Sequence, residues 1–251
     1  MNDVGESKTR DNVVFTWQPN GKIIVFVLIF LPIFCSLGVW QLSRAEEKRT
    51  LQENWSLQQS LDAISDLNLI EAKKNQFRRF VGTGRFERDR YWLIENKTFQ
   101  GQLGFEVLMP FVFDDGTTLL VNRGWVAGAG TRSDLPKIET PVGSTQIVGN
   151  IVEPSDHPLL KEKPEINHSW PKLILEVDIQ ALAVQLDKKL YTKILQLDAE
   201  SDAAFILNWR PFNMSPSKHL GYAVQWFSMA IALLLLAVFA NSNLANVLKN
   251  R

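Results

Sequence analysis

Two long apolar runs near opposite ends of the chain enclose one polar stretch. The runs cover residues 23–42 and 222–240, and neither contains an Asp, Glu, Lys or Arg side chain. Each has about the 20 residues that an α-helix needs to cross the hydrocarbon core of a bilayer. The pattern therefore predicts two transmembrane helices that flank a polar domain at 43–221, with tails at 1–22 and 241–251.

The first run is predicted to be a retained anchor rather than a cleaved signal peptide. It is too long for the apolar region of a signal peptide, and its end at Trp40 offers no small-x-small cleavage site. The residues before it contain as many acidic as basic side chains, whereas mitochondrial transit peptides are poor in acids. We therefore expect a bacterial inner (plasma) membrane, with both tails in the cytoplasm and the central domain in the periplasm.

Apolar and polar positions in the central domain first follow a helical pattern and then a strand pattern. Residues 44–61 contain no Gly or Pro and predict that the first helix continues beyond the membrane. Strands are predicted at 77–86, 91–95, 104–113, 117–126, 146–153, 173–177, 189–197 and 205–209. Asp114-Asp115-Gly116 is a hairpin turn signal between two of these strands.

Two other segments complete the predicted domain. Asp178 can cap a short helix that runs to Leu186, and the proline-rich segment 154–171 is predicted to be a loop. The predicted fold class is an α+β membrane protein. Its two transmembrane helices flank a mainly antiparallel β external domain that forms a partly closed barrel.

Composition excludes several classes of protein. The chain has 27 basic and 27 acidic side chains, with no basic patch that would bind nucleic acid. Its only cysteine, Cys35, lies in the first apolar run, so the external domain has no thiol for redox chemistry or copper transport. The known motifs for zinc hydrolysis, serine hydrolysis, phosphate binding and dinucleotide binding do not occur. We therefore expect no enzymatic activity.

One candidate site lies where the polar domain meets the second apolar run. On a helix, His219, Tyr222 and Trp226 fall at positions i, i+3 and i+7, which share one face. A neutral imidazole is a good axial ligand for a haem iron, and aromatic rings beside it can stack on the macrocycle. The first run ends with Trp40, Gln41 and Arg44 at the same membrane surface, because the two runs cross in opposite directions, so the two clusters are predicted to meet there. A guanidinium such as that of Arg44 suits a haem propionate.

The same residues have a simpler interpretation. Trp and Tyr side chains are enriched at membrane interfaces as anchors, and Arg side chains reach toward the headgroups. His157 and His168 have no acidic or thiol partner, so they are predicted to be loop residues rather than metal ligands. Arg123 either anchors the fold or faces a partner, and both interpretations stay open.

Three motifs lie in order at the two membrane junctions and in the middle of the domain. The first is Gly38-x-Trp40-Gln41-x-x-Arg44 followed by Lys48, and the second is Gly101-x-x-Gly104-Phe105-x-Val107-x-x-Pro110 leading to Val121-Asn122-Arg123-Gly124-Trp125-Val126. The third is His219-Leu220-x-Tyr222-Ala223-x-x-Trp226-Phe227. Together with the two spans, these motifs resemble the Surfeit locus protein 1 family of cytochrome c oxidase assembly factors. Departures from the usual pattern of the family are Ala127, Ser217, Lys218 and Gln225.

The resemblance implies a non-enzymatic chaperone in the assembly of respiratory chain complex IV. It implies binding of haem a in transit and help in its insertion into the catalytic subunit. The implied partners are cytochrome c oxidase subunit I and haem A synthase, beside membrane lipid. His219 is then the implied axial ligand of the haem iron, with Tyr222, Trp226, Trp40 and Arg44 around the cofactor.

Two other functions are compared with the two spans and the external domain of this chain. A structural scaffold would stabilise an oxidase intermediate without holding a cofactor, and it predicts that His219 can be replaced without loss of oxidase haem. A membrane receptor with a ligand-binding external domain is disfavoured, because the tails at 1–22 and 241–251 are too short for an output domain.

Overall fold

The computed structural model describes residues 14–128, 135–154, 169–209 and 215–249. The chain divides into two compact units, of which one contains Met1–Leu51 and Phe212–Arg251 and the other contains Gln52–Pro211. The predictions for His157 and His168, and for most of the loop at 154–171, lie outside the described residues.

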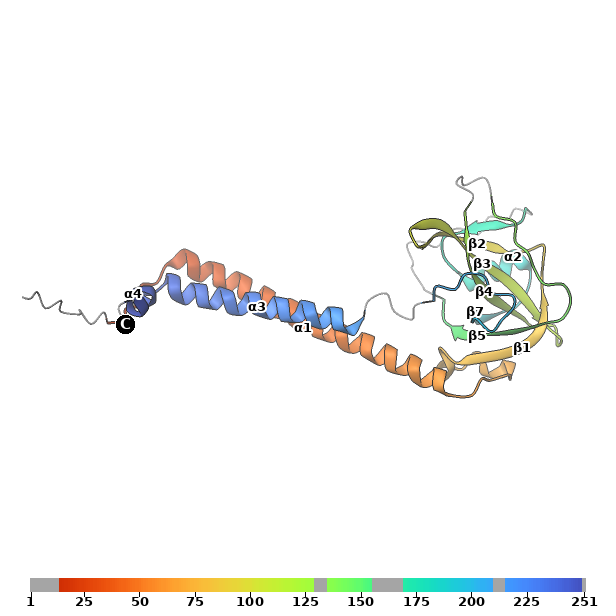
Figure 1. The fold of residues 1–251 in the computed structure, drawn as a ribbon, viewed down its shortest axis with the longest axis horizontal. Helices are drawn as coiled ribbons and strands as arrows, with labels where there is room; N and C mark the ends of the chain where they lie inside the picture. The colour runs from red at the N-terminus through yellow and green to blue at the C-terminus, as the bar shows by residue number, and fades with distance from the viewer. Residues whose placement is uncertain (1–13, 129–134, 155–168, 210–214, 250–251) are drawn as a thin grey trace, which may run out of the picture. The chain divides into compact units, whose positions relative to one another are not determined.

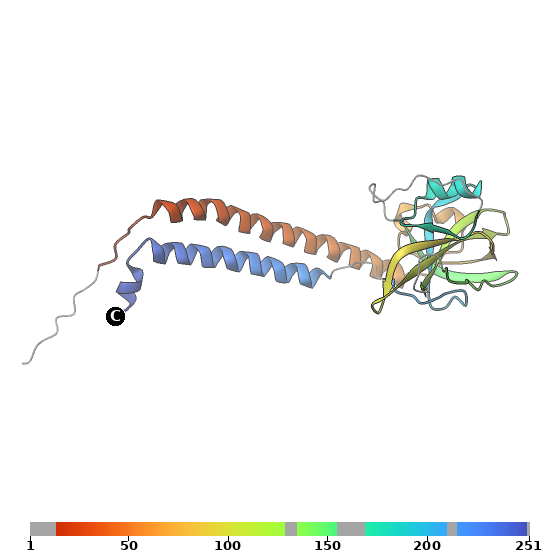
Figure 2. The same cartoon turned by 90° about the horizontal axis from the view of Figure 1, so that it is seen from above.

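The first unit is built from two antiparallel helices. α1 (Gly21–Ser60) and α3 (Pro216–Ala240) run side by side in both views (Figures 1 and 2), and α4 (Leu244–Lys249) follows α3. Both long helices are apolar and long enough to cross a membrane, as the two apolar runs predict. The helical stretch predicted after residue 44 is part of α1, and residues 52–60 of this helix belong to the second unit.

Small residues allow α1 and α3 to approach each other. Gly38 and Ala45 are the buried residues of α1, and Ala223 and Ala230 are those of α3. A Cβ atom at Gly38 would lie 2.7 Å from the ring of Phe227, which is closer than side-chain atoms normally pack. Close backbone approach at small residues is a main source of helix association in lipid.

Asn241 and Asn243 join the end of α3 to the segment that precedes α1. The Gln18 N–H donates to the Asn241 carbonyl at 2.6 Å, and the Asn20 N–H donates to the Asn241 side-chain oxygen at 2.5 Å. The Thr16 N–H donates to the Asn243 side-chain oxygen at 2.7 Å, and the Asn243 N–H donates back to Thr16 at 3.1 Å. These bonds tie the segment before α1 to the end of α3.

The second unit contains a closed five-stranded β-barrel. Its strands are β1 (Arg79–Phe86), β3 (Gln102–Phe113), β4 (Thr118–Ala127), β5 (Thr145–Val152) and β7 (Leu190–Leu197). They follow the order β1-β5-β7-β4-β3, and β1 pairs with β3 to close the ring (Figure 1). β2 (Trp92–Phe99) and β6 (Lys172–Ile174) extend the sheet beyond β3. The pairings β4–β7 and β2–β6 are parallel, and the other pairings are antiparallel.

The predicted fold class is confirmed, and the barrel is closed rather than partly closed. Gly84 lies opposite Phe113 where β1 meets β3. A Cβ atom at Gly84 would clash with the backbone carbonyl of Val112. The missing side chain therefore permits the close strand approach that completes the ring.

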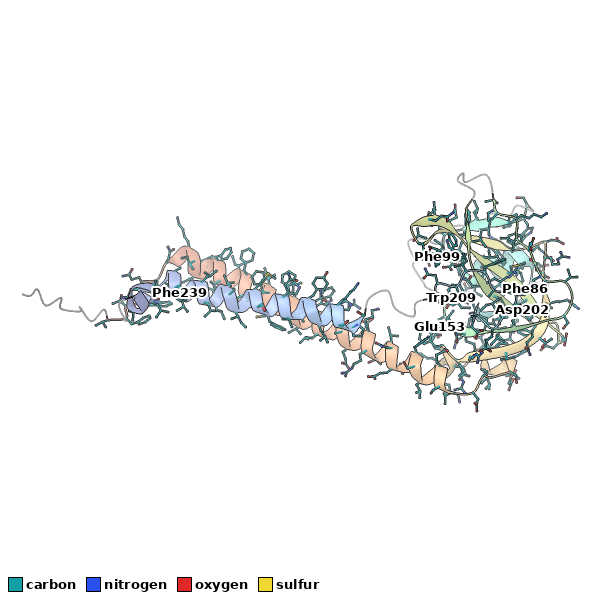
Figure 3. The ribbon with its side chains drawn as sticks, viewed as in Figure 1. Phe86, Phe99, Glu153, Asp202, Trp209 and Phe239 are labelled. Carbon is teal, nitrogen blue, oxygen red and sulfur yellow. The ribbon has the colours of Figure 1, made fainter. Side chains whose placement is uncertain are left out.

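Apolar side chains from all five strands of the ring fill the barrel. The rings of Phe86 and Phe111 meet edge to face with centroids 4.9 Å apart, and Figure 3 labels Phe86. The fully buried members of this cluster include Ile70, Phe80, Val107, Met109, Leu119, Val121, Ile147, Ile151, Leu195 and Leu197. Burial of this apolar surface is the main source of stability for the unit.

Helix α2 (Ile179–Leu186) covers a second apolar cluster that includes Ile194 of β7. The cap predicted for this helix is confirmed. The Asp178 carboxylate accepts from the N–H groups of Gln180 and Ala181 at 3.0 and 3.2 Å, which satisfies two donors that the first helical turn leaves free.

The prediction of a strand at 205–209 is wrong. This segment forms only an isolated bridge between Ile206 and Trp125, in which the Trp125 N–H donates to the Ile206 carbonyl at 2.7 Å. Gly124 has a φ angle of +111°, so β4 leaves its regular pleat beside this segment and a longer ladder does not form. The other predicted strands are present, although the one at 173–177 is limited to Lys172–Ile174.

Candidate functional site

The start of α3 places His219 on the side of the helix that faces α1. Pro216 begins the helix, because its fixed φ suits the first turn and its missing N–H is not needed there. His219 therefore lies in the first turn. Ala223 and Ala230 follow on the same face at helical spacing, and both are buried.

Gln41 of α1 is the hydrogen-bond partner of His219. The Nδ1 atom of His219 lies 2.8 Å from the Oε1 atom of Gln41. Gln41 is three residues after Gly38, where Phe227 packs, so it lies on the same face of α1. Among the described residues, none forms a hydrogen bond with Nε2 of His219. Within the described residues, one ring nitrogen is therefore held by a hydrogen bond and the other has no such partner.

Of the two aromatic residues predicted beside His219, one packs between the helices. The ring centroid of Trp226 lies 5.9 Å from that of Phe34 on α1. Tyr222 lies at the edge of this face, and its side chain is 49% exposed. The structure thus brings His219 and Trp226 to one side of α3, with the Tyr222 ring open to the surroundings.

Trp40 and Arg44 lie beside each other on an exposed part of α1. Trp40 is one residue before Gln41, which places it about 100° further round the helix, and it is 50% exposed. The Arg44 guanidinium lies 5.9 Å from the centroid of the Trp40 ring and forms an ion pair with Glu47 at 2.6 Å. The structure therefore groups Trp40 with Arg44 and Glu47, and groups Gln41 with His219.

The sequence contained a signal for each partner that was not predicted as a site residue. Gln41 falls on the stripe of small residues formed by Gly38 and Ala45, which is the face that meets the second helix. Glu47 follows Arg44 at the i+3 spacing of helical ion pairs.

A haem iron needs fewer ligands from the protein than a bare metal ion does. Among the described ranges, no group of three or more His, Cys, Asp or Glu side chains could hold a metal ion. A haem needs only an axial nitrogen from the protein, together with apolar contact for its ring. His219 can supply the nitrogen, and the half-exposed Tyr222 ring can supply the contact.

Arg123 is an anchor of the barrel. Of the two interpretations that the sequence left open, an anchor of the fold or a residue that faces a partner, the structure supports the first. Its side chain is 2% exposed, and its guanidinium donates to the carbonyls of Ala203 at 2.8 Å and Glu139 at 2.9 Å. It also lies over the Phe205 ring at 4.2 Å. Burial lowers the pKa of Arg123 to about 10, so the guanidinium remains charged at neutral pH.

A pocket between the β3–β4 turn and the start of β7 has no free carboxylate in its lining. Asp115 accepts from the N–H and hydroxyl groups of Thr117 at 2.9 and 2.6 Å, and these bonds lower the pKa of Asp115. Glu71 accepts from the Thr192 N–H at 2.6 Å. Both acidic side chains of the pocket lining are therefore held by their neighbours.

Comparisons with known proteins identify the family. Residues 28–231 match the sequence model of the SURF1 family. A SURF1-like protein of Rickettsia felis is 26% identical over 231 residues, which cover 90% of this chain and 100% of that protein. An uncharacterized SURF1-like protein of Mycobacterium tuberculosis is 26% identical over 229 residues, which cover 87% of this chain and 82% of that protein. Because the family match covers most of its length, the chain belongs to the SURF1 family.

Proposed function

We propose that this chain is an assembly factor for cytochrome c oxidase. It would hold haem a at the periplasmic surface of the inner membrane and help its insertion into the catalytic subunit. The observation that carries the proposal is the hydrogen bonding of His219. Gln41 holds Nδ1 at 2.8 Å, whereas Nε2 has no hydrogen-bond partner among the described residues. When bound, haem a would supply an iron that takes an imidazole nitrogen as axial ligand. Membership of the SURF1 family supports the proposal.

The position of His219 suits a cofactor with a long apolar tail. His219 opens a helix that is apolar and long enough to cross a membrane. Within the next two turns, Tyr222 and Val224 are exposed. This apolar helix surface would let the isoprenoid tail of haem a remain with lipid while Nε2 of His219 faces the iron.

The proposed partners are cytochrome c oxidase subunit I, which would receive the haem, and haem A synthase, which would supply it. We place the protein in the bacterial inner membrane with the barrel in the periplasm. Arg44 is the proposed partner of a haem propionate. Since its guanidinium is 2.6 Å from the Glu47 carboxylate, it would have to exchange or share that carboxylate. No enzymatic step is assigned.

The proposal is tested by the absorption spectrum of the full chain, purified in detergent from cells that co-produce haem A. We expect haem a bands in the wild type and their loss in His219→Ala. His157→Ala and His168→Ala remove the other two histidines of the chain and serve as matched controls that retain the bands. A wild type without haem, or a His219→Ala variant with full haem content, contradicts the proposal.

The same hydrogen bond favours a second candidate function, a scaffold that stabilises an oxidase intermediate without binding a cofactor. A polar contact between membrane helices stabilises a helix pair on its own by about 0.6–2 kcal/mol, so the bond from Gln41 to His219 has a use without haem. The scaffold predicts that oxidase purified from cells carrying His219→Ala retains its normal haem a content. The haem carrier predicts a deficit.

A further inference from the structure

We propose that Gln41 is a positioning residue for His219, an inference that rests on the proposed function. The side-chain carbonyl of Gln41 accepts the hydrogen bond of the Nδ1–H group, with 2.8 Å between the heavy atoms. A neutral imidazole carries one N–H group and one lone pair. Because the proton is held on Nδ1, the lone pair is on Nε2, which is the nitrogen left available for an axial ligand bond.

Helix packing places Gln41 where it can hold the ring. Gly38 brings α1 close to α3, since even a Cβ atom there would lie 2.7 Å from Phe227. Gln41 follows one turn later on the same face, and His219 is two turns before Phe227 on the antiparallel partner helix. The buried Ala45 lies one further turn along this face of α1. Two rigid helices therefore set the position of the amide relative to the ring.

The hydrogen bond fixes both the tautomer and the direction of the imidazole. A metal-binding histidine commonly donates its second N–H to a carbonyl or carboxylate group, and loss of that partner typically lowers metal affinity about 10–100-fold. Without Gln41, the His219 ring is free to rotate and to carry its proton on Nε2, a form that cannot bind iron through that nitrogen. Gln41 therefore acts through His219 and need not touch the cofactor.

Two substitutions separate the acceptor role of Gln41 from its shape. Gln41→Leu keeps a similar size but removes both the acceptor and the donor. Gln41→Glu keeps a carbonyl-type acceptor, and its ionised carboxylate has no N–H to donate. Gln225→Leu is a matched control, because Gln225 is an exposed glutamine on α3.

The first readout needs no haem. In the full chain labelled with ¹⁵N-histidine and held in detergent, only three imidazoles contribute signals, and His219→Ala assigns the one from His219. We expect a protonated Nδ1 and an unprotonated Nε2 for His219 in the wild type, in Gln41→Glu and in Gln225→Leu. Gln41→Leu should show a mixture of tautomers. A wild type with the proton on Nε2, or a Gln41→Leu signal identical to the wild type, overturns the inference.

The second readout is haem a affinity, measured by titration into the same detergent-solubilised variants. Gln41→Leu should bind about 10–100-fold more weakly than the wild type, while Gln41→Glu and Gln225→Leu retain affinity within a few-fold. Loss of binding in His219→Ala together with unchanged binding in Gln41→Leu overturns the role of Gln41 alone. Unchanged binding in His219→Ala overturns the proposed function itself.

Discussion

At the scale of single residues, a buried charge shows how the barrel depends on one side chain. The Arg123 guanidinium donates to two backbone carbonyls, those of Ala203 and Glu139, and its burial lowers its pKa to about 10. Replacement by Met removes the cost of burying the charge but leaves both carbonyls without this donor. Since an unpaired buried acceptor costs about 1–3 kcal/mol, we expect Arg123→Met to lower the free energy of unfolding by roughly 2–4 kcal/mol.

Thermal unfolding of the full chain in detergent, followed by near-ultraviolet circular dichroism, measures this effect. Arg88→Met is the matched control, because Arg88 is exposed and such surface changes usually alter stability by about 0.5 kcal/mol or less. An Arg123→Met midpoint equal to that of the control would show that the carbonyls find other partners.

Residue identities alone predicted part of the candidate site. The 3.6-residue period of a helix is enough to place His219 and Trp226 on one face of α3. It did not pair Gln41 with His219, because the contact between two helices depends on their rotation and relative depth. The role of Arg123 could not be predicted for a related reason. The sequence period of a strand does not indicate which loop carbonyls an arginine on that strand will bind.

At the scale of elements, we expect the helix pair to tolerate no added side chain at Gly38. Gly38→Val would force the ring of Phe227 away from α1, because even a Cβ atom there lies 2.7 Å from that ring. The bond between Gln41 and His219 should then be lost. The expected results are the mixed ¹⁵N tautomer signal of Gln41→Leu and a haem a affinity at least about 10-fold weaker.

Gly221→Val is the control for this substitution, since an added Cβ atom at Gly221 meets no atom within 4 Å. Gly221 is also closer in sequence to His219 than Gly38 is, so a general effect of valine near the site would appear in both variants. Equal haem affinity in the two variants would mean that close helix packing is not required.

Elements were more predictable than their arrangement. Apolar runs and alternation located both long helices and most strands, because these patterns follow directly from helix and strand periods. Closure of the barrel was not predicted, since it depends on β1 meeting β3 near Gly84. The segment at 205–209 has the composition of a strand, but the positive φ of Gly124 prevents a ladder from extending beside it. Such pairings are long-range events that local pattern does not report.

At the scale of the whole molecule, the two units differ in where their large apolar side chains lie. The helix pair exposes large apolar side chains, and Figure 3 labels one of them, Phe239 near the end of α3. The barrel instead encloses its apolar side chains. This division is what a protein with one unit in lipid and one in water requires, and it makes the direction of insertion a testable property.

We expect the barrel to lie outside the cytoplasm and the tails to lie inside. Cys35, the only cysteine, lies in α1, so a Cys35→Ser background allows single cysteines to report position. Asp202→Cys places a thiol at an exposed site of the barrel unit (Figure 3), and Gln18→Cys places one before α1. A membrane-impermeant maleimide added to spheroplasts should label Asp202→Cys at once and Gln18→Cys only after permeabilisation. The opposite labelling would put His219 at the cytoplasmic surface, since His219 lies in the first turn of α3, which is the end of that helix that follows the barrel unit in the chain. Haem a would then have to reach His219 from the cytoplasmic side of the membrane.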